Sequence, residues 1–152
     1  MHTGCLQKMR YNDSLPNVIS CSSGICACAK GGQCNHALHL IVGMRHKYLL
    51  PNVIIYNSGN NACEKDGQWH HALAMLVWMR HHNLQLDVIS YNSTIRACDK
   101  DGQWHQARRL LVGMGHTYFL PDVVSYSSAI VACEKGGRSK HALGLLAKDA
   151  TQ

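Results

Sequence analysis

The segment VIIYNSGNNACEKDGQW at residues 53–69 is followed, 35 residues later, by VISYNSTIRACDKDGQW at residues 88–104. The two segments align without a gap, and related segments begin at Val18 and Val123. So many identities at one fixed spacing indicate tandem repeats, in which each unit packs mainly on its neighbours. The spacing predicts one continuous solenoid, with the tail of a preceding repeat at 1–17, repeats at 18–52, 53–87 and 88–122, and a truncated repeat at 123–152.

Each repeat has the pattern of two helices. In the first half, Tyr91, Ile95 and Cys98 recur at helical spacing, and a glycine such as Gly67 follows as a helix stop. The second half carries a denser apolar face, for example at 72–79, and Pro51 and Pro121 mark the connections to the next repeat. The pattern therefore predicts an all-α fold, an α-solenoid of stacked helix-turn-helix repeats.

Four positions of the first half are invariant across the four repeats. These are the alanines Ala27, Ala62, Ala97 and Ala132, the cysteines Cys28, Cys63, Cys98 and Cys133, the lysines Lys30, Lys65, Lys100 and Lys135, and the glycines Gly32, Gly67, Gly102 and Gly137. One cysteine per repeat predicts thiols about 10 Å apart, a helix-packing distance, which is too far for a shared zinc ion. With no C-x-x-C pair in the sequence, we expect small buried core cysteines in a reducing compartment, no metal and no cofactor.

Composition narrows the classes of function. The 152 residues are 46% hydrophobic and 16% charged, with a net charge of +6 that suits a polyanionic partner. No apolar run approaches 18 residues and the first ten residues carry no secretory signal, so we expect no membrane partner and find no targeting peptide. No acidic or nucleophilic residue that recurs in every repeat lies near the histidine pairs at 70–71 and 81–82. We therefore expect no enzymatic activity and no catalytic residue. Neither end has a polar capping helix, which indicates a fragment of a longer array or ends covered by a partner.

The chain resembles the pentatricopeptide repeat family, in particular its P-type repeats of 35 residues. The resemblance rests on the period, on the segment 88–104 and on LLVGMGHTYFLPD at 110–122. The tetratricopeptide repeat has a period of about 34 residues and an early Trp-Leu-Gly-Tyr pattern, which is missing here. The family resemblance implies single-stranded RNA as the partner, read at one base per repeat. It also implies organellar RNA processing or stabilisation, in a plastid or a mitochondrion.

The resemblance assigns the site residues. The base-reading positions are Ser22, Asn57, Asn92 and Ser127, paired with the last residues of the repeats, Asn52, Asp87 and Asp122. The residues that sandwich the base are Ile19, Ile54, Ile89 and Val124. In the family's code Asn with Asp favours uracil and Ser with Asn favours adenine, so the three complete pairs imply a 5′-A-U-U-3′ core. The laddered lysines Lys30, Lys65, Lys100 and Lys135 would contact phosphates, although a lysine there also balances the helix dipole.

Some positions depart from the family pattern, and one alternative function stays open. Cys21 replaces a tyrosine, Leu86 replaces a proline, and Asn60 places an amide on a face that we expect to be buried. Trp69 and Trp104, at the start of second helices, are expected to pack between repeats and not to stack on bases. The alternative is a helical scaffold for protein–protein interaction, since a solenoid surface suits peptides as well as nucleic acids. The small polar residues at every reading position favour RNA.

Overall fold

In the computed structural model, residues 17–149 and 151 are described, and they form eight helices. In chain order these are α2 (Val18–Gly31), α3 (Cys34–His46), α4 (Val53–Asp66), α5 (Trp69–His81), α6 (Val88–Lys100), α7 (Trp104–Gly115), α8 (Val123–Lys135) and α9 (Ser139–Asp149). No strand occurs within these residues, which confirms the all-α prediction. The predicted partial repeat at 1–17 lies outside the described residues, apart from Asn17.

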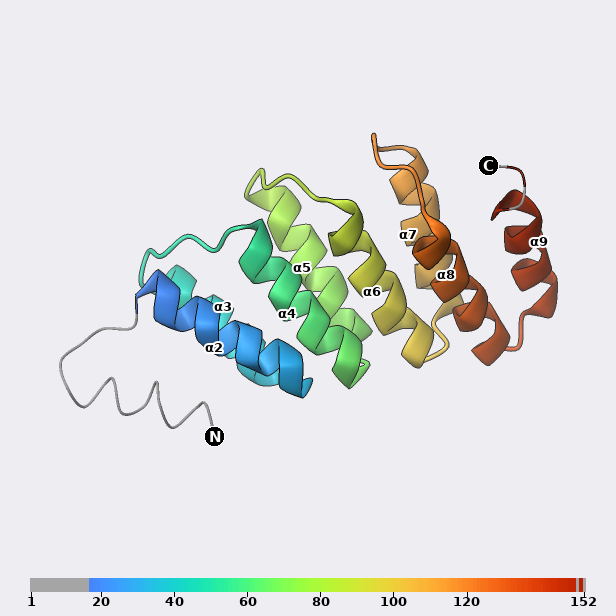
Figure 1. Cartoon of the computed structure of the whole chain (residues 1–152). Coiled ribbons are helices and arrows are strands. Elements are labelled where there is room, and N and C mark those ends of the chain that lie inside the picture. Colours follow the sequence, from blue (N-terminus) through green and yellow to red (C-terminus); the bar gives the residue numbers. More distant parts are fainter. Residues whose placement is uncertain (1–16, 150, 152) are drawn as a thin grey trace.

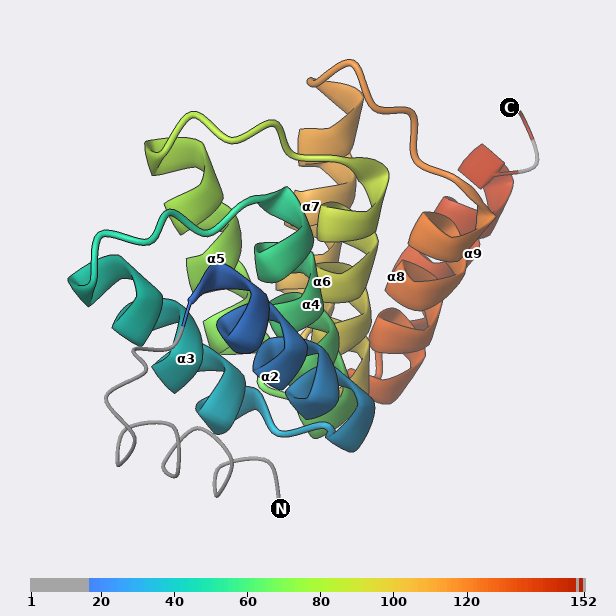
Figure 2. The ribbon, with the colours of Figure 1, turned by 60° about the vertical axis from the view of Figure 1, so that its left-hand side comes forward.

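The helices form two layers in a row of pairs (Figure 1). The first helices of the pairs pack on one another in the order α2, α4, α6 and α8, and each second helix packs on the first helix of its own pair. The helices α3, α5 and α7 also contact the first helix of the next pair, and Figure 2 shows them together on one side of α2, α4 and α6. This is the predicted solenoid. The exposed side of α2, α4, α6 and α8 is called the first-helix face below.

Polar caps and glycines determine where the first helices begin and end. Asn17 and Asn52 accept a backbone hydrogen bond at the start of α2 and α4, and aspartates do the same for α6 and α8. At the other end, Gly32 and Gly67 cap α2 and α4 in the left-handed conformation, with φ of 63° and 71°. Only glycine adopts this conformation without steric cost, so the predicted helix stops are confirmed.

The core lies between the two layers and repeats with the sequence. Met44, Met79 and Met114, one from each of α3, α5 and α7, are at most 1% exposed. Tyr56 and Tyr91 of the first helices are equally buried. The hydroxyl of Tyr91 accepts a hydrogen bond at 2.8 Å from Arg80 of the preceding second helix, which ties two neighbouring repeats together.

The second repeat carries a packing defect. Asn60 is fully buried, and neither its Nδ2 nor its Oδ1 has a hydrogen-bond partner among the described residues. The expected buried amide is therefore confirmed. The adjacent Gly59 leaves no room for a side chain, because a Cβ there would lie 2.8 Å from Ile41 Cδ1 and 2.9 Å from Met75 Sδ. Apolar side chains pack closely against this part of α4, so the amide of Asn60 has no polar partner.

The prediction that all cysteines are free is wrong for one pair. A disulfide joins Cys34, at the start of α3, to Cys63 near the end of α4, with their Cα atoms 4.5 Å apart. Cys34 stands where the later repeats have Trp69 and Trp104, so it belongs to no cysteine ladder. Its proximity to Cys63 arises because α3 packs on the first helix of the next repeat. The expected spacing between laddered cysteines carries no information about such a contact.

Candidate functional site

The last residue of each complete repeat caps the next first helix. Asn52 Oδ1 accepts from the backbone N–H of Ile55 at 3.0 Å, at the start of α4. Asp87 Oδ1 accepts from Ser90 N at 2.8 Å, and Asp122 Oδ1 accepts in the same way from the third residue of α8. A side-chain oxygen at this position satisfies a backbone donor that a helix otherwise leaves free. The cap also fixes where each of these side chains lies on the first-helix face.

Two of the three predicted reading pairs are in direct contact. Asn57 Nδ2 lies 3.2 and 3.3 Å from the two carboxylate oxygens of Asp87. Asn92 Nδ2 lies 3.1 and 3.3 Å from those of Asp122. The members of each pair are the fifth and the last residue of one repeat, 30 residues apart, and the aspartate caps the first helix of the next repeat. Stacking of the first helices therefore brings together residues that the sequence pairs only through the family resemblance.

A serine completes each of these two contacts, and sequence reasoning missed it. The hydroxyl of Ser90 lies 2.7 Å from Asn57 Oδ1 and also 2.7 Å from Asp87 Oδ1. The hydroxyl of Ser125 lies 2.6 Å from Asn92 Oδ1 and forms the equivalent capping box with Asp122. Both serines are fully buried. The sequence signal was the serine three residues after each capping aspartate, a capping pattern with no family role attached to it.

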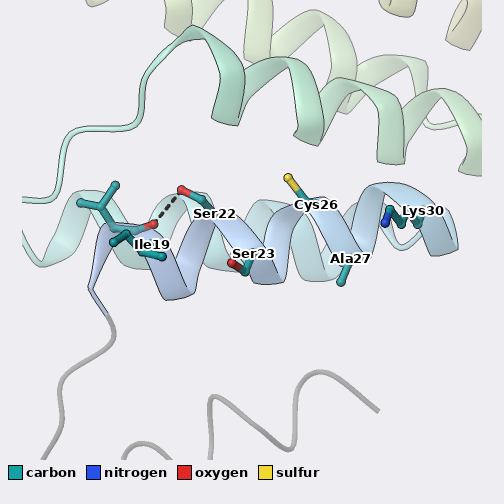
Figure 3. Close-up of a pocket in the computed structure, with 7 residues that line it drawn as sticks. Ile19, Ser22, Ser23, Cys26, Ala27 and Lys30 are labelled. Carbon is teal, nitrogen blue, oxygen red and sulfur yellow. Dashed lines mark hydrogen bonds between the residues drawn. The ribbon is translucent and has the colours of Figure 1, made fainter.

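The first reading pair is arranged differently. The Ser22 hydroxyl donates to the carbonyl of Val18 at 2.6 Å, within its own helix (Figure 3). Asn52 uses its oxygen for the cap on Ile55, which stands where the later repeats have the bridging serine. Ser127 in the last repeat also donates locally, to the Val124 carbonyl at 3.1 Å. The structure thus brings together two Asn/Asp pairs and leaves the serine positions bonded to their own helices.

The predicted base-sandwiching residues form an exposed aliphatic row on the first-helix face. Each is the second residue of its helix, and the exposed fractions are 75% for Ile19, 71% for Ile54, 57% for Ile89 and 43% for Val124. An exposed β-branched residue at one repeated position has no role in the core. The row instead offers flat apolar surface beside each reading position.

The laddered lysines lie at the other end of the same helices, and three of the four already have partners. Lys65 Nζ donates to the backbone carbonyl of Lys30 at 3.2 Å, and Lys100 Nζ donates likewise to the carbonyl of Lys65. Lys135 Nζ lies 2.7 Å from Asp99 Oδ1. Each bond joins one repeat to the preceding one and satisfies a carbonyl or carboxylate at a helix C-terminus. These contacts give the lysines a structural role next to the predicted phosphate contact.

The hydrogen bonds at the last reading pair also lower the pKa of Asp122. Partial burial, the largest single influence, raises this pKa, because it disfavours the charged form. The backbone N–H and hydroxyl of Ser125, the amide of Asn92 and the backbone of Val124 favour the carboxylate, and together they outweigh the burial. Asp122 is therefore held in its charged, hydrogen-bond-accepting form.

Other side chains that the sequence singled out have structural positions. Trp69 and Trp104 pack against the core, as predicted, and Trp69 Nε1 also donates to Asp101 Oδ2 of the next repeat at 3.0 Å. Burial raises the pKa of the Cys98 thiol to about 12. Within the described part of the chain, no three His, Cys, Asp or Glu side chains gather as metal ligands would. None of the described helices is both long and apolar enough to cross a membrane.

Comparisons with known proteins agree with this architecture. The family model of the pentatricopeptide repeat domain matches residues 5–64 and 75–136. A crystal structure of the pentatricopeptide repeat protein PPR10 from maize superposes with a TM-score of 0.76 at 25% identity, over 98% of this chain and 21% of that one. A structure of PPR10 in complex with an 18-nt psaJ RNA element gives the same TM-score at 22% identity, over 99% and 23% of the two chains. The chain thus spans about a fifth of the length of these proteins. No curated protein matches it.

Proposed function

We propose, from the premise that this chain belongs to the pentatricopeptide repeat family, that its first-helix face binds single-stranded RNA and reads one base per repeat. The observation that carries this proposal is the pair of hydrogen-bonded Asn/Asp contacts, Asn57 with Asp87 and Asn92 with Asp122. They recur at the same place in consecutive repeats, beside the exposed aliphatic row. A structural neighbour, PPR10, has been crystallised with an RNA element, which agrees with a nucleic acid as the partner.

The hydrogen-bond inventory of the asparagines supports base reading. A primary amide has two N–H donors and an oxygen with two lone pairs. In Asn92, Asp122 engages one donor and Ser125 engages one lone pair, so one donor and one lone pair are left for a ligand. The carboxylate and the hydroxyl also fix which end of the amide is the donor. A uracil edge presents an N–H between two carbonyl oxygens, so it can bond to both remaining groups of the amide at once.

The family code assigns a short target to the three complete pairs. Ser22 with Asn52 would read adenine, and each of the two Asn/Asp pairs would read uracil, which gives 5′-A-U-U-3′. Ser127 has no partner residue within the chain, so it adds no base to this core. An aliphatic side chain such as Ile54 or Ile89 would lie against the flat face of each base. The lysine row would add a sequence-independent attraction to phosphates.

The same proposal extends to the biological role. Nothing at the first-helix face calls for bond-making chemistry, so the chain would act by occupying its transcript, and it would stabilise that transcript or direct its processing by other factors. The family's usual setting suggests a plastid or a mitochondrion. Further repeats or protein partners would adjoin α2 and α9 at the two ends of the row (Figure 1).

A protein-interaction scaffold is the second candidate, and one observation favours it. The loops that follow α3 and α7 expose Tyr48, Leu50, Tyr118 and Leu120, by 77% or more each. These side chains are not part of the first-helix face as defined above, and RNA reading does not use them. Exposed aromatic and leucine side chains are typical of protein contacts.

The deciding experiment measures fluorescence anisotropy with labelled single-stranded RNAs of equal length, one containing 5′-AUU-3′ and the other 5′-GCC-3′, and with a duplex. Tighter, salt-sensitive binding to the AUU strand is the expected result. An Asn57→Ala, Asn92→Ala double variant should lose this preference while keeping its helical circular dichroism. Equal binding to all three probes would mean that the chain attracts nucleic acids only through its positive charge and reads no bases. No binding by the folded chain would favour the scaffold.

A further inference from the structure

One arginine lies on the first-helix face beyond the reading positions. Arg96 is the sole arginine of α2, α4, α6 and α8, and it follows Asn92 by four residues on α6. Residues four apart on a helix share one face and are separated by about 5–6 Å. Arg96 therefore lies one helical turn from a reading asparagine, on the way to Lys100. None of the roles that the family resemblance assigns falls on this position.

Arg96 lines a hollow that spans three repeats. The hollow is bordered by Lys30 and Ala29 of α2, by Asn61, Glu64 and Lys65 of α4, and by Arg96 of α6. Three of these side chains are cationic and one is anionic. The hollow thus has a net positive charge, which suits a phosphate group. Asn61 is held in place because its Oδ1 accepts from the Ser93 hydroxyl at 2.9 Å.

The guanidinium of Arg96 is oriented by a carboxylate and keeps its outer donors. Arg96 Nε lies 3.0 Å from Glu64 Oε1, and the side chains are 53% and 15% exposed. Glu64 thus engages the inner nitrogen, and neither terminal NH₂ group has a hydrogen-bond partner among the described residues. Paired terminal donors match the geometry of two phosphate oxygens better than a lysine ammonium does. The neighbouring Lys65 and Lys100 ammonium groups are already bonded to backbone carbonyls.

We propose that Arg96 binds the phosphodiester between the two nucleotides read by Asn57/Asp87 and Asn92/Asp122, with Glu64 as a positioning residue. The inference rests on the proposed RNA-binding function and adds a residue to it. Arg96 extends from α6 to Glu64 on α4, so its guanidinium lies between the repeats that hold these two pairs. The phosphate that links their two bases would cross the array at the same place.

The test uses two AUU-containing RNAs that differ by one substituent on one phosphorus. In one, the phosphodiester between the two uridines is replaced by an uncharged methylphosphonate, and both carry 2′-deoxyuridine on the 5′ side of that linkage. The wild type should bind the modified strand about tenfold more weakly. Arg96→Gln should show the same loss with the unmodified strand and no further loss with the modified one. For Arg96→Gln on the unmodified strand, the slope of log K against log salt should be smaller in magnitude than that of the wild type by about 0.7.

Control variants separate this site from general charge effects. Arg109→Gln removes one exposed arginine from α7, in the other layer, and should keep the sensitivity to the methylphosphonate. Glu64→Gln keeps an acceptor for Arg96 Nε but removes a charge that repels phosphate, so it should bind RNA more tightly. If wild type and Arg96→Gln lose equal affinity on the modified strand, the assignment of Arg96 is wrong while RNA binding stands. If the wild type binds no single-stranded RNA, the proposed function fails, and this inference fails with it.

Discussion

Asn92 on α6 and Asp122 at the start of α8 form one unit, in which the amide nitrogen lies 3.1 and 3.3 Å from the two carboxylate oxygens. The same carboxylate caps α8 through Ser125. A single side chain therefore both starts a helix and orients the group that would read a base. Stability and recognition are coupled at this position, because a substitution that removes the carboxylate also removes the cap.

This coupling predicts a specific loss of stability in acid. The pKa of Asp122 is lowered in the folded chain, so the ionised carboxylate contributes stability that is fully present above the unfolded pKa of about 4. That contribution is lost as pH falls through the lower, folded pKa. Asp122→Asn keeps a cap acceptor but does not ionise, so its unfolding free energy should fall less between pH 5 and pH 2. Urea unfolding followed by circular dichroism measures this, and parallel pH curves for the two proteins would contradict it.

The disulfide predicts a redox-dependent stability. Cys34–Cys63 closes a loop of 29 residues, and the loop-entropy relation gives a stabilisation of about 3–4 kcal/mol. Reduction should therefore lower the urea midpoint of the wild type but not that of Cys34→Ala. Cys26→Ala, at an exposed free cysteine, should respond to reductant as the wild type does. Alkylation of the unfolded, non-reduced chain should label the five described free cysteines and leave Cys34 and Cys63 unlabelled, and labelling of these two would show that the bond is absent.

Asn60 offers a stabilising substitution. Leaving a buried amide without partners costs about 1–3 kcal/mol. The other repeats have Ile25, Ile95 and Ile130 at this position, so Asn60→Ile should raise the unfolding free energy, by less than the full amount because Gly59 is tightly surrounded. Asn61→Ile changes the adjacent but exposed amide, which bonds to Ser93, and should give no gain. Equal stability of Asn60→Ile and wild type would mean that the amide has found a partner, such as a buried water.

Two glycines with opposite surroundings test the packing of the last repeat. A Cβ on Gly136 would lie 2.6 Å from Trp104 Cδ1 and 2.9 Å from the Gly102 carbonyl oxygen, so Gly136→Ala should cost about 1–3 kcal/mol. Gly144, inside α9, has nothing within 4 Å of its Cβ position, so Gly144→Ala should add about 0.5–1 kcal/mol. Thermal unfolding of the two variants compares them directly. A destabilised Gly144→Ala together with a neutral Gly136→Ala would contradict this packing.

The sequence was most informative where one residue type decides a local conformation. Gly32 and Gly67 could be recognised as helix stops because glycine adopts their left-handed backbone angles without steric cost. The reading positions were accessible only through the family resemblance, since nothing in the spacing pairs Asn92 with Asp122. The Cys34–Cys63 bond and the Ser90 and Ser125 bridges depend on how one repeat packs on the next. Aligning the repeats shows which positions are equivalent, but it does not show which residues of neighbouring repeats are in contact.

The contrast between the first reading pair and the other two predicts that base preference can be transferred. Ser22 and Asn52 are bonded locally, and Ile55 stands where Ser90 and Ser125 bridge the later pairs. The triple variant Ser22→Asn, Asn52→Asp, Ile55→Ser would give the first repeat the arrangement seen at Asn92. Its preference should change from AUU to UUU in competition binding. Without Ile55→Ser, the amide of residue 22 lacks the hydroxyl that fixes its orientation, so the change should be smaller.

Because Ile55 is buried, the triple variant should also lose stability, which circular dichroism at the assay temperature monitors. An unchanged AUU preference in a folded triple variant would show that these three residues do not read the first base.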